Sequence, residues 1–450
     1  MMQQVRKAAD VSPVSGSRAH HPQGRSDAWR AAHRRLYEHL CKHKEGDQPT
    51  LEDLQPLYQA VAHGCQAGLQ QEAYDKVWVA RVRHGNEYYS TKKLGVFGSD
   101  LGATACFFDQ PWNRVSQTLT ERTQGVLLNE AAYRLRGLGR LTESLELMRG
   151  GIEFAAKLND WRNASAGASN LSELELTLGE VAGAVGDAEQ SVTYADRSGD
   201  ASRRMSSRTT HADALHQAGR RTEAETRFRE AEQIQQEMQP DYPLLCTLQG
   251  FQYCDLLLAV AEQAAWRLVQ SSKLISECRA VSQRTAQTLK WVRDGNLSLL
   301  PIALDHLTLG RAALYEAILS KSEIQNPKSE IEQAVSGLRR ASQQDEFPKA
   351  LLTRVWLRFL TGACTGPESA QADLDEAWEI AERGPMRLFM ADIHLYRARL
   401  FGNPKSEVRS VEYPWGAPTT DLLAARKLIE QCGYWRRKEE LEHAERVIGV

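Results

Sequence analysis

The chain of 450 residues lacks the motifs of the common nucleotide-dependent enzymes. No Gly-Lys dipeptide occurs, so the GxxxxGK[S/T] loop that cradles phosphates is absent, and so is GxGxxG. The zinc-protease motif HExxH and the nucleophile elbow GxSxG are missing as well. These absences exclude a P-loop or a Rossmann-type site of recognisable sequence. We therefore expect no enzyme activity and no cofactor.

Paired cysteines, long apolar runs and an excess of one charge are also missing. The eight cysteines are scattered without a CxxC pair, which indicates a reduced, cytoplasmic protein. No run of about 18 apolar residues occurs, and residues 1–27 have no apolar core for a signal peptide, so we expect no membrane contact. The 56 basic and 58 acidic residues nearly cancel, which argues against a protein that coats nucleic acid.

What the sequence has instead is helical periodicity and a repeat. From Ala28 onward apolar residues recur every three or four positions, and alternating β-type runs are missing. The turn glycines Gly139, Gly179 and Gly219 stand 40 residues apart. Small residues recur at three offsets from these glycines, and a large apolar residue recurs at a fourth. The small residues are Ala132, Ser172 and Ala212 seven before, Ser144, Ala184 and Ala224 five after, and Gly151, Ser191 and Ala231 twelve after; the large apolar residues, fifteen after, are Phe154, Tyr194 and Ile234. Glu175 breaks a further column, four before the glycine, in which the other repeats have leucine.

These columns predict stacked antiparallel helix hairpins. Small residues let two helices approach closely, and a glycine ends the first helix in the left-handed conformation. One hairpin cannot bury its own apolar face, so neighbours must stack on it. We therefore predict an all-α fold, an α-solenoid of about nine or ten hairpins. Further helices are expected at 303–315, 330–343, 350–360, 370–383, 388–400 and 422–448, whereas 84–120 and 260–300 are either irregular connections or eroded repeats.

The pattern over residues 122–236 resembles the tetratricopeptide (TPR) repeat, although its period is 40 rather than about 34 and the first-helix Trp is missing. An earlier degenerate unit has Gly68 as turn glycine, with Val61 before it and Ala73 and Ala80 after it. We expect a disordered tail or linker remnant at 1–27, a degenerate TPR-like region at 28–121, three regular repeats at 122–240, and degenerate repeats at 241–450.

Several stretches are similar to the TPR sensor arrays at the C-termini of bacterial STAND-type (NACHT or NB-ARC) signalling ATPases. They are 169–179, 209–221, 376–385 and 432–441. In that family the array recognises a ligand or an invader protein, and an upstream ATPase oligomerises. The resemblance implies a sensor or adaptor of bacterial signalling or defence, either free-standing or detached from its ATPase, with a signalling ATPase or protease as a further partner.

A concave groove is the expected binding surface. In TPR-like stacks it is lined by first-helix residues that face away from the seam of small residues. Projected onto this chain, that arc selects mostly polar residues with one aromatic, which suits a protein or peptide ligand. They are Asn129, Tyr133, Arg136, Asn170, Glu173, Thr177, Thr209, Asp213, His216 and Gln217.

Two alternatives stay open: a partner-activated enzyme with its chemistry in 84–120 or 260–300, and a nucleic-acid-binding helical repeat. The most basic segment, 201–240, has seven basic and six acidic residues, so nucleic acid is the less favoured partner. A cluster of possible metal ligands consists of His33, His39, Cys41, His43, His63 and Cys65. Of these, His39 and His43 would share one helical face, but a polar helix face is the favoured interpretation and no metal site is predicted.

Overall fold

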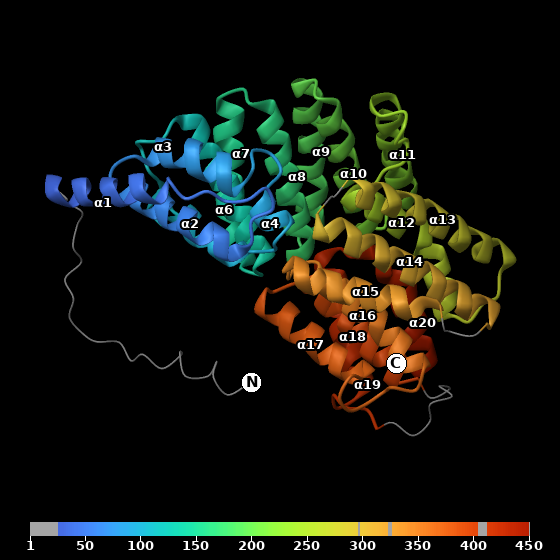
Figure 1. Cartoon of the computed structure of the whole chain (residues 1–450). Coiled ribbons are helices and arrows are strands. Elements are labelled where there is room, and N and C mark those ends of the chain that lie inside the picture. The colour runs from blue at the N-terminus through green and yellow to red at the C-terminus, as the bar shows by residue number, and fades with distance from the viewer. Residues whose placement is uncertain (1–25, 296–297, 323–325, 404–411, 450) are drawn as a thin grey trace.

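The computed structural model describes residues 26–295, 298–322, 326–403 and 412–449. Within these ranges the chain has twenty α-helices and a single two-stranded ribbon (Figure 1). The predicted all-α, helical-repeat fold is confirmed. The predicted tail at 1–27 lies outside the described residues except for its last two, and α1 begins at Asp27. No helix in the described part of the chain has both the length and the apolar composition needed to cross a bilayer.

Seven helix hairpins follow one another through the described residues between 121 and 432, each built from two neighbouring helices in contact. They are α6 (Glu121–Gly137) with α7 (Leu141–Lys157), α8 (Trp161–Leu178) with α9 (Val181–Ser198), α10 (Ala201–Gln217) with α11 (Arg221–Met238), α12 (Thr247–Trp266) with α13 (Ser272–Asp294), α14 (Leu299–Ser320) with α15 (Asn326–Ala341), α16 (Phe347–Leu360) with α17 (Ala370–Arg383), and α18 (Arg387–Phe401) with α19 (Pro418–Cys432). The 3₁₀ turn η2 (Trp435–Arg437) and α20 (Lys438–Ile448) follow. The described residues of segment 260–300 are thus part of regular hairpins. The helix expected over 422–448 is in fact two, because Gly433 takes a left-handed φ of +70°.

The seam of small residues is present as predicted. Gly139, Gly179 and Gly219 have φ values of +75°, +88° and +75°, which a residue with a Cβ adopts only with strain. The small residues seven before and five after these glycines have no exposed surface. Hydroxyl groups also link the paired helices: Ser144 Oγ donates to the Ala132 carbonyl at 2.7 Å, and Ser172 Oγ donates to the Ala184 carbonyl at 2.8 Å.

The N-terminal region is less regular, and for this reason the repeats are fewer than expected. It contains α1 (Asp27–Leu40), α2 (Leu51–Gln66), α3 (Gln70–Ala73), the π-helix η1 (Tyr74–Val82), α4 (Tyr89–Lys92), α5 (Phe97–Ala105), and the antiparallel strands β1 (Phe108–Gln110) and β2 (Arg114–Val115). The unit around Gly68 exists, with Val61 and Ala73 buried. Ala80 is exposed, however, so its predicted place in the seam is wrong. The wider π-helical turn of η1 changes the angular position of each residue relative to an α-helix.

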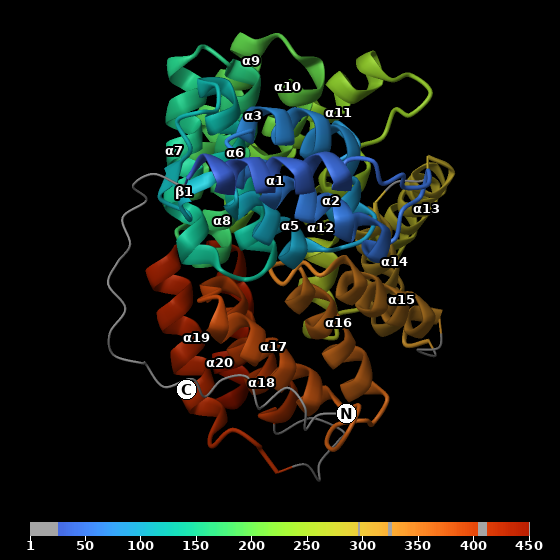
Figure 2. The ribbon, with the colours of Figure 1, turned by 60° about the vertical axis from the view of Figure 1, so that its left-hand side comes forward.

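The stack coils back on itself, so that the C-terminal helices pack beside the middle of the chain (Figures 1 and 2). The backbone N–H of Gln344 donates to the Gly137 carbonyl at 2.8 Å and thereby joins the α15–α16 turn to the end of α6. At Gly179 a Cβ would lie 2.6 Å from Cys432 Sγ, and at Gly219 one would lie 2.9 Å from Trp435 Cβ. The turn glycines therefore also permit this closure.

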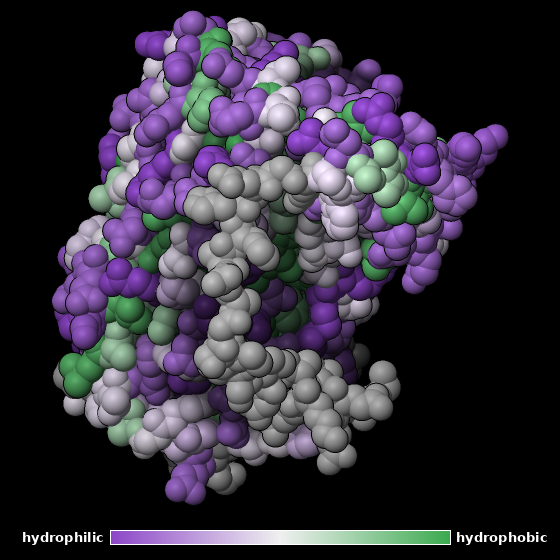
Figure 3. All heavy atoms as spheres, turned by 90° about the vertical axis from the view of Figure 1, so that its left-hand side faces the viewer, coloured by the Kyte–Doolittle hydropathy of each residue, from purple (hydrophilic) through white to green (hydrophobic). Residues whose placement is uncertain are grey.

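Aromatic packing holds the C-terminal half together. The rings of Trp266 and Trp356 stack with centroids 3.7 Å apart, and Tyr396 packs edge-on against Trp266 at 5.1 Å. These side chains belong to α12, α16 and α18, so they fix three of the helices that surround the site described below. The outer surface in Figure 3 is mostly hydrophilic, and the apolar residues on that face gather in small groups.

Candidate ligand-binding pocket

The coiled stack encloses a pocket, here called the central pocket, whose wall comes from the first helix of all seven hairpins and from η2. It measures about 990 Å³, including the space at its mouth. Its charged residues are Arg136, Glu173, Asp213, Asp255, Glu262, Arg311, Asp345, Glu346, Lys349, Asp392, Arg436 and Arg437; its apolar and aromatic residues are Leu176, Leu248, Phe251, Tyr315, Leu352, Leu388, Phe389, Tyr396 and Tyr434; the others are Thr177, Gln217, Gln252 and Thr353.

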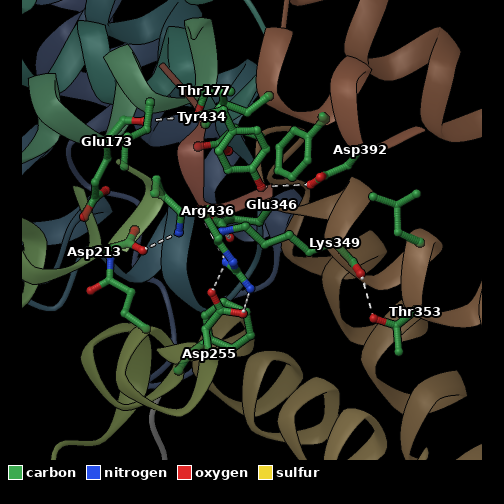
Figure 4. A pocket seen from close by; sticks show the side chains of 18 of the residues that line it. Glu173, Thr177, Asp213, Asp255, Glu346, Lys349, Thr353, Asp392, Tyr434 and Arg436 are labelled. Atoms are coloured by element: carbon green, nitrogen blue, oxygen red, sulfur yellow. Dashed lines mark hydrogen bonds and ion pairs between the residues drawn. The ribbon is translucent and has the colours of Figure 1, made fainter. Parts of the chain in front are cut away.

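Three arginines, which we call the arginine clasp (Arg311, Arg436 and Arg437), pair with Asp255 and Glu262 on α12, and Arg436 and Arg437 thereby join the end of the chain to this wall. Arg436 bonds to Asp255 on α12 at 3.2 Å through Nη2, and it points into the pocket (Figure 4). Arg437 bonds to Glu262 on the same helix at 3.0 Å. Because α12 and η2 lie about 180 residues apart in sequence, these ion pairs hold the coiled stack closed.

The clasp and the carboxylates stabilise each other's charged forms. Burial by itself would raise the pKa of Asp255, but Arg436 and Arg311 hold that pKa well below its ordinary value. Burial opposes ionisation of Glu262 too, yet the three arginines lower its pKa to about 2. Arg437 also bonds to Asp392 at 2.8 Å, and Tyr434 donates its hydroxyl to the same carboxylate at 3.1 Å. All these charges are therefore paired with one another.

A second set of ion pairs lies on the other side of the pocket. Arg136 on α6 bonds to Glu173 on α8 at 2.7 Å and to Asp345 in the α15–α16 turn at 2.6 Å. Lys349 pairs with Glu346 at 2.6 Å. Burial raises the pKa of Asp345 to about 6, although the charge of Arg136 opposes this shift. The bond between Arg136 and Asp345 joins the N-terminal and C-terminal walls of the pocket.

Asp213 differs from the other carboxylates because it has no ion-pair partner among the described residues. Its only side-chain hydrogen bond comes from Gln217 Nε2 at 2.8 Å. Burial raises the pKa of Asp213 to about 6, against the charge of Lys349. The pocket as a whole has seven carboxylates and five cations. Its electrostatics therefore favour a ligand that brings a positive charge to Asp213.

The predicted groove residues divide among three places. Arg136, Glu173, Thr177, Asp213 and Gln217 line the central pocket. Asn129, Tyr133 and Asn170 line a neighbouring one, which we call the second pocket. Its lining consists of Tyr88, Lys92, Arg122, Gly125, Val126, Asn129, Glu130, Tyr133, Arg134, Gly151, Ala155, Leu158, Asp160, Asn163, Ala166, Asn170 and Arg203.

The remaining two predicted residues, Thr209 and His216, are buried and line neither pocket. Thr209 Oγ1 donates to the Ser206 carbonyl within its own helix at 2.7 Å. His216 Nε2 lies 3.7 Å from Asp255 Oδ2 behind the pocket wall. Burial and the charge of Arg436 lower the pKa of His216 well below its ordinary value, so the imidazole is neutral.

Sequence reasoning missed the C-terminal half of the pocket wall, because the repeat columns were read only over 122–236. A usable sign was present in α12, where Asp255 and Glu262 interrupt an otherwise apolar helix. Charges in such a helix must be paired when the helix is buried. That sign predicts partners for the two carboxylates, but it does not identify them as Arg311, Arg436 and Arg437.

No metal site is predicted at the histidine cluster near the N-terminus, but two of its residues are expected to share a helix face. The prediction that His39 and His43 share one helical face is wrong, because α1 ends at Leu40 and His43 instead bonds to the Asp53 carbonyl at 3.0 Å. The Nδ1 atoms of His33 and His63 lie 2.8 Å apart. Among the described residues no group of three or more His, Cys, Asp or Glu is placed to hold a metal ion. All eight cysteines are unpaired.

No protein-family model matches the chain, and comparison with curated proteins found no relative. Two solved structures follow a similar course. The Rap conjugation gene regulator of the plasmid pLS20 in complex with the Phr* peptide is 10% identical, with 95% of this chain and 100% of that chain covered and a TM-score of 0.45. A Rap protein complexed with Competence and Sporulation Factor is 11% identical, with 94% and 97% covered and a TM-score of 0.34. At these scores neither structure identifies a ligand for this chain, and the resemblance to STAND sensor arrays stays a prediction.

Proposed function

We propose that the chain is a non-enzymatic receptor that binds a short peptide in the central pocket, with a positively charged group of the peptide beside Asp213. The observation that carries this proposal is the unpaired carboxylate of Asp213 in a pocket where the other carboxylates have arginine or lysine partners. A ligand amine or guanidinium at that point would favour the ionised carboxylate and so bring the pKa of Asp213 down from about 6.

The remaining wall supports a peptide rather than a bare cation. Leu248, Phe251, Leu352, Leu388 and Phe389 supply apolar surface beside the charged groups. A partly enclosed pocket with this mixed charged, apolar and aromatic lining has the composition typical of a site for a small ligand rather than for a folded domain.

The closure of the stack around the pocket gives ligand binding a way to change the conformation of the chain. A ligand between Arg136 and Arg436 would contact both the N-terminal and the C-terminal walls, and so would favour one relative position of the two. In this proposal the chain is a sensor or adaptor that passes this change to a signalling partner. The bacterial signalling or defence context and the ATPase or protease partner remain predictions from the sequence resemblance.

The test is an affinity selection with the full chain. A synthetic pool of random hexapeptides is passed over the immobilised protein, and enriched peptides are labelled and titrated by fluorescence polarisation. We expect peptides with Lys, Arg or a free N-terminus at one fixed position to be enriched. Asp213→Asn should weaken their binding by tenfold or more, because removing one partner of a buried charge pair costs about 2–5 kcal/mol.

Asp241→Asn is the matched control, since Asp241 is exposed and lines neither pocket. It should leave the affinity unchanged. Failure of the pool to enrich any peptide above the bare resin, or equal affinities for the wild type and Asp213→Asn, would contradict the proposal.

A further inference from the structure

The second pocket lies one helical turn from the central pocket along two helices. On α6, Tyr133 faces the second pocket and Arg136 the central one, and on α8 the same holds for Asn170 and Glu173. Residues three apart on a helix are separated by about 4.5 Å along its axis. The second pocket measures about 1000 Å³ including its mouth. In the second pocket the cations outnumber the carboxylates, whereas in the central pocket the carboxylates outnumber the cations.

Both carboxylates of the second pocket are already engaged. Glu130 accepts a hydrogen bond from Trp78 Nε1 at 3.1 Å, and it also pairs with Arg83 and with Arg134. Asp160 caps α8 by accepting from the Asn163 backbone amide at 3.2 Å and from its side chain at 2.8 Å. It lies 3.5 Å from Arg122 as well. Neither carboxylate is therefore free to neutralise another cation.

Lys92 and Arg203 are the cations left without a carboxylate partner in the described part of the pocket. Lys92, the last residue of α4, reaches solvent and lies over the ring of Tyr88 at 5.0 Å. Arg203, in the first turn of α10, is half-buried. Loss of hydration lowers the pKa of Lys92, and the positive charge of Arg203 lowers it further. Loss of hydration and the charge of Arg162 lower the pKa of Arg203. The charge of Asp200 opposes the shift at Arg203, and what places the two cations together is that both line this pocket.

Two amides complete the wall without partners of their own. The side chains of Asn129 and Asn170 make no hydrogen bond to another described residue, and Asn129 Oδ1 is buried. The buried atom is Asn129 Oδ1, an acceptor whose partner would be water, whereas the Nδ2 donors of both amides also have no partner among the described residues and are available to an anion. Here two amides and two cations without partners line a single pocket.

We propose that the second pocket binds a phosphate group between Lys92 and Arg203, with the amides of Asn129 and Asn170 donating hydrogen bonds to it. A phosphate carries about two negative charges near pH 7 and so matches two unpaired cations, whereas a carboxylate carries one and would leave a cation unpaired. The pocket is larger than a phosphate ion, which favours a phosphate monoester over the free ion. This inference does not rest on peptide binding in the central pocket.

The test uses thermal unfolding of the full chain with four added sodium salts: chloride, acetate, inorganic phosphate and O-phosphoserine. Ionic strength is matched, and each anion is kept at or below about 10 mM, where the general stabilising effect of phosphate salts is small. We expect a saturable rise in Tm with the two phosphates and none with acetate beyond chloride, because a ligand that binds only the folded state stabilises it. A larger rise with O-phosphoserine identifies an ester ligand, and an equal or larger rise with inorganic phosphate identifies the free ion.

Arg203→Gln and Lys92→Gln separate binding from folding. Without phosphate, each variant should be at least as stable as the wild type, because the repulsion between the two cations is relieved. With phosphate, each should lose the rise in Tm. Lys290→Gln on α13, an exposed lysine outside both pockets, should respond like the wild type. No rise above chloride, an equal rise with acetate, or an undiminished rise in both pocket variants would overturn the proposal.

Discussion

Glu175 provides a direct test of how the repeat tolerates a charge in its core. It occupies the position where the neighbouring repeats have Leu135 and Leu215, and its exposed fraction is only 4%. Arg149 on α7 lies 3.4 Å from Glu175 Oε1, and Oε2 has no hydrogen-bond partner. A Cβ at Gly183 would lie 3.1 Å from Oε2, so the glycine on α9 leaves room for the carboxyl group. We predict that Glu175→Gln stabilises the protein in a pH-dependent way.

The magnitude follows from the pKa. Burial, and after it the charge of Asp187, raises the pKa of Glu175 from 4.5 to about 7, while Arg149 opposes the shift. The folded chain thus holds this proton to a higher pH than the unfolded chain, and stability falls as the pH rises from about 4.5 to 7. At about 1.4 kcal/mol per pKa unit, the ionised carboxyl costs about 3 kcal/mol at pH 8 and about 1 kcal/mol at pH 5. Glutamine cannot ionise and removes this cost.

The assay is urea or thermal unfolding of both proteins between pH 5 and pH 8.5 at constant ionic strength. Glu175→Gln should exceed the wild type by about 2–3 kcal/mol more at pH 8 than at pH 5. Glu153→Gln is the control, because Glu153 is exposed on α7, and it should show no such trend. A gain that does not depend on pH, or a loss of stability at pH 8, would refute the reasoning.

Two further predictions concern the closure of the stack. Gly179→Ala and Gly219→Ala should each lower Tm more than Gly199→Ala does: all three carry the cost of about 1 kcal/mol for a positive φ, but at Gly199 a Cβ meets nothing within 4 Å. Equal losses in all three variants would show that the glycines do not serve the closure. Arg437→Met leaves Glu262, Asp392 and Glu440 without this cation, so it should lower the free energy of unfolding in urea by about 3–5 kcal/mol. Arg426→Met removes a partly exposed ion pair and should lower it by about 1 kcal/mol or less. Arg437→Met should also make stability depend less on pH in acid. The stability that ionised Glu262 contributes is present above about pH 4.5 and is lost as the pH falls toward 2. An equally steep loss of stability in acid in Arg437→Met would contradict this.

The sequence predicted the parts of the fold that depend on local pattern. The intervals between Gly139, Gly179 and Gly219 identified the hairpins, since a turn and a seam of small residues involve contacts within about 40 residues. The same projection brought Arg136, Glu173 and Asp213 to one wall of the central pocket. It placed Thr209 and His216 in the same arc, and these two are buried, because a projection of one helix does not include the helices that later cover it.

Hydrophobic periodicity could not predict where the backbone is irregular. The π-helical turn that exposes Ala80 and the early end of α1 before His43 both change which residues share a face. A regular 3.6-residue pattern assumes that neither occurs. The structure therefore corrected the expectations in the N-terminal region, while those for the regular repeats needed little change.

By itself the sequence determined that the chain is a stack of helix hairpins, because helix periodicity and small-residue columns are local properties. The closure of the stack was decided only by the tertiary structure. Small rotations between successive hairpins add up along the chain, and no local pattern records their sum. That sum brings Arg136 to Asp345 and Arg436 to Asp255, across 209 and 181 residues. The central pocket depends on this closure, which brings α18 and η2 to the wall formed by α6, α8 and α10, whereas the residues that line the second pocket all lie between Tyr88 and Arg203.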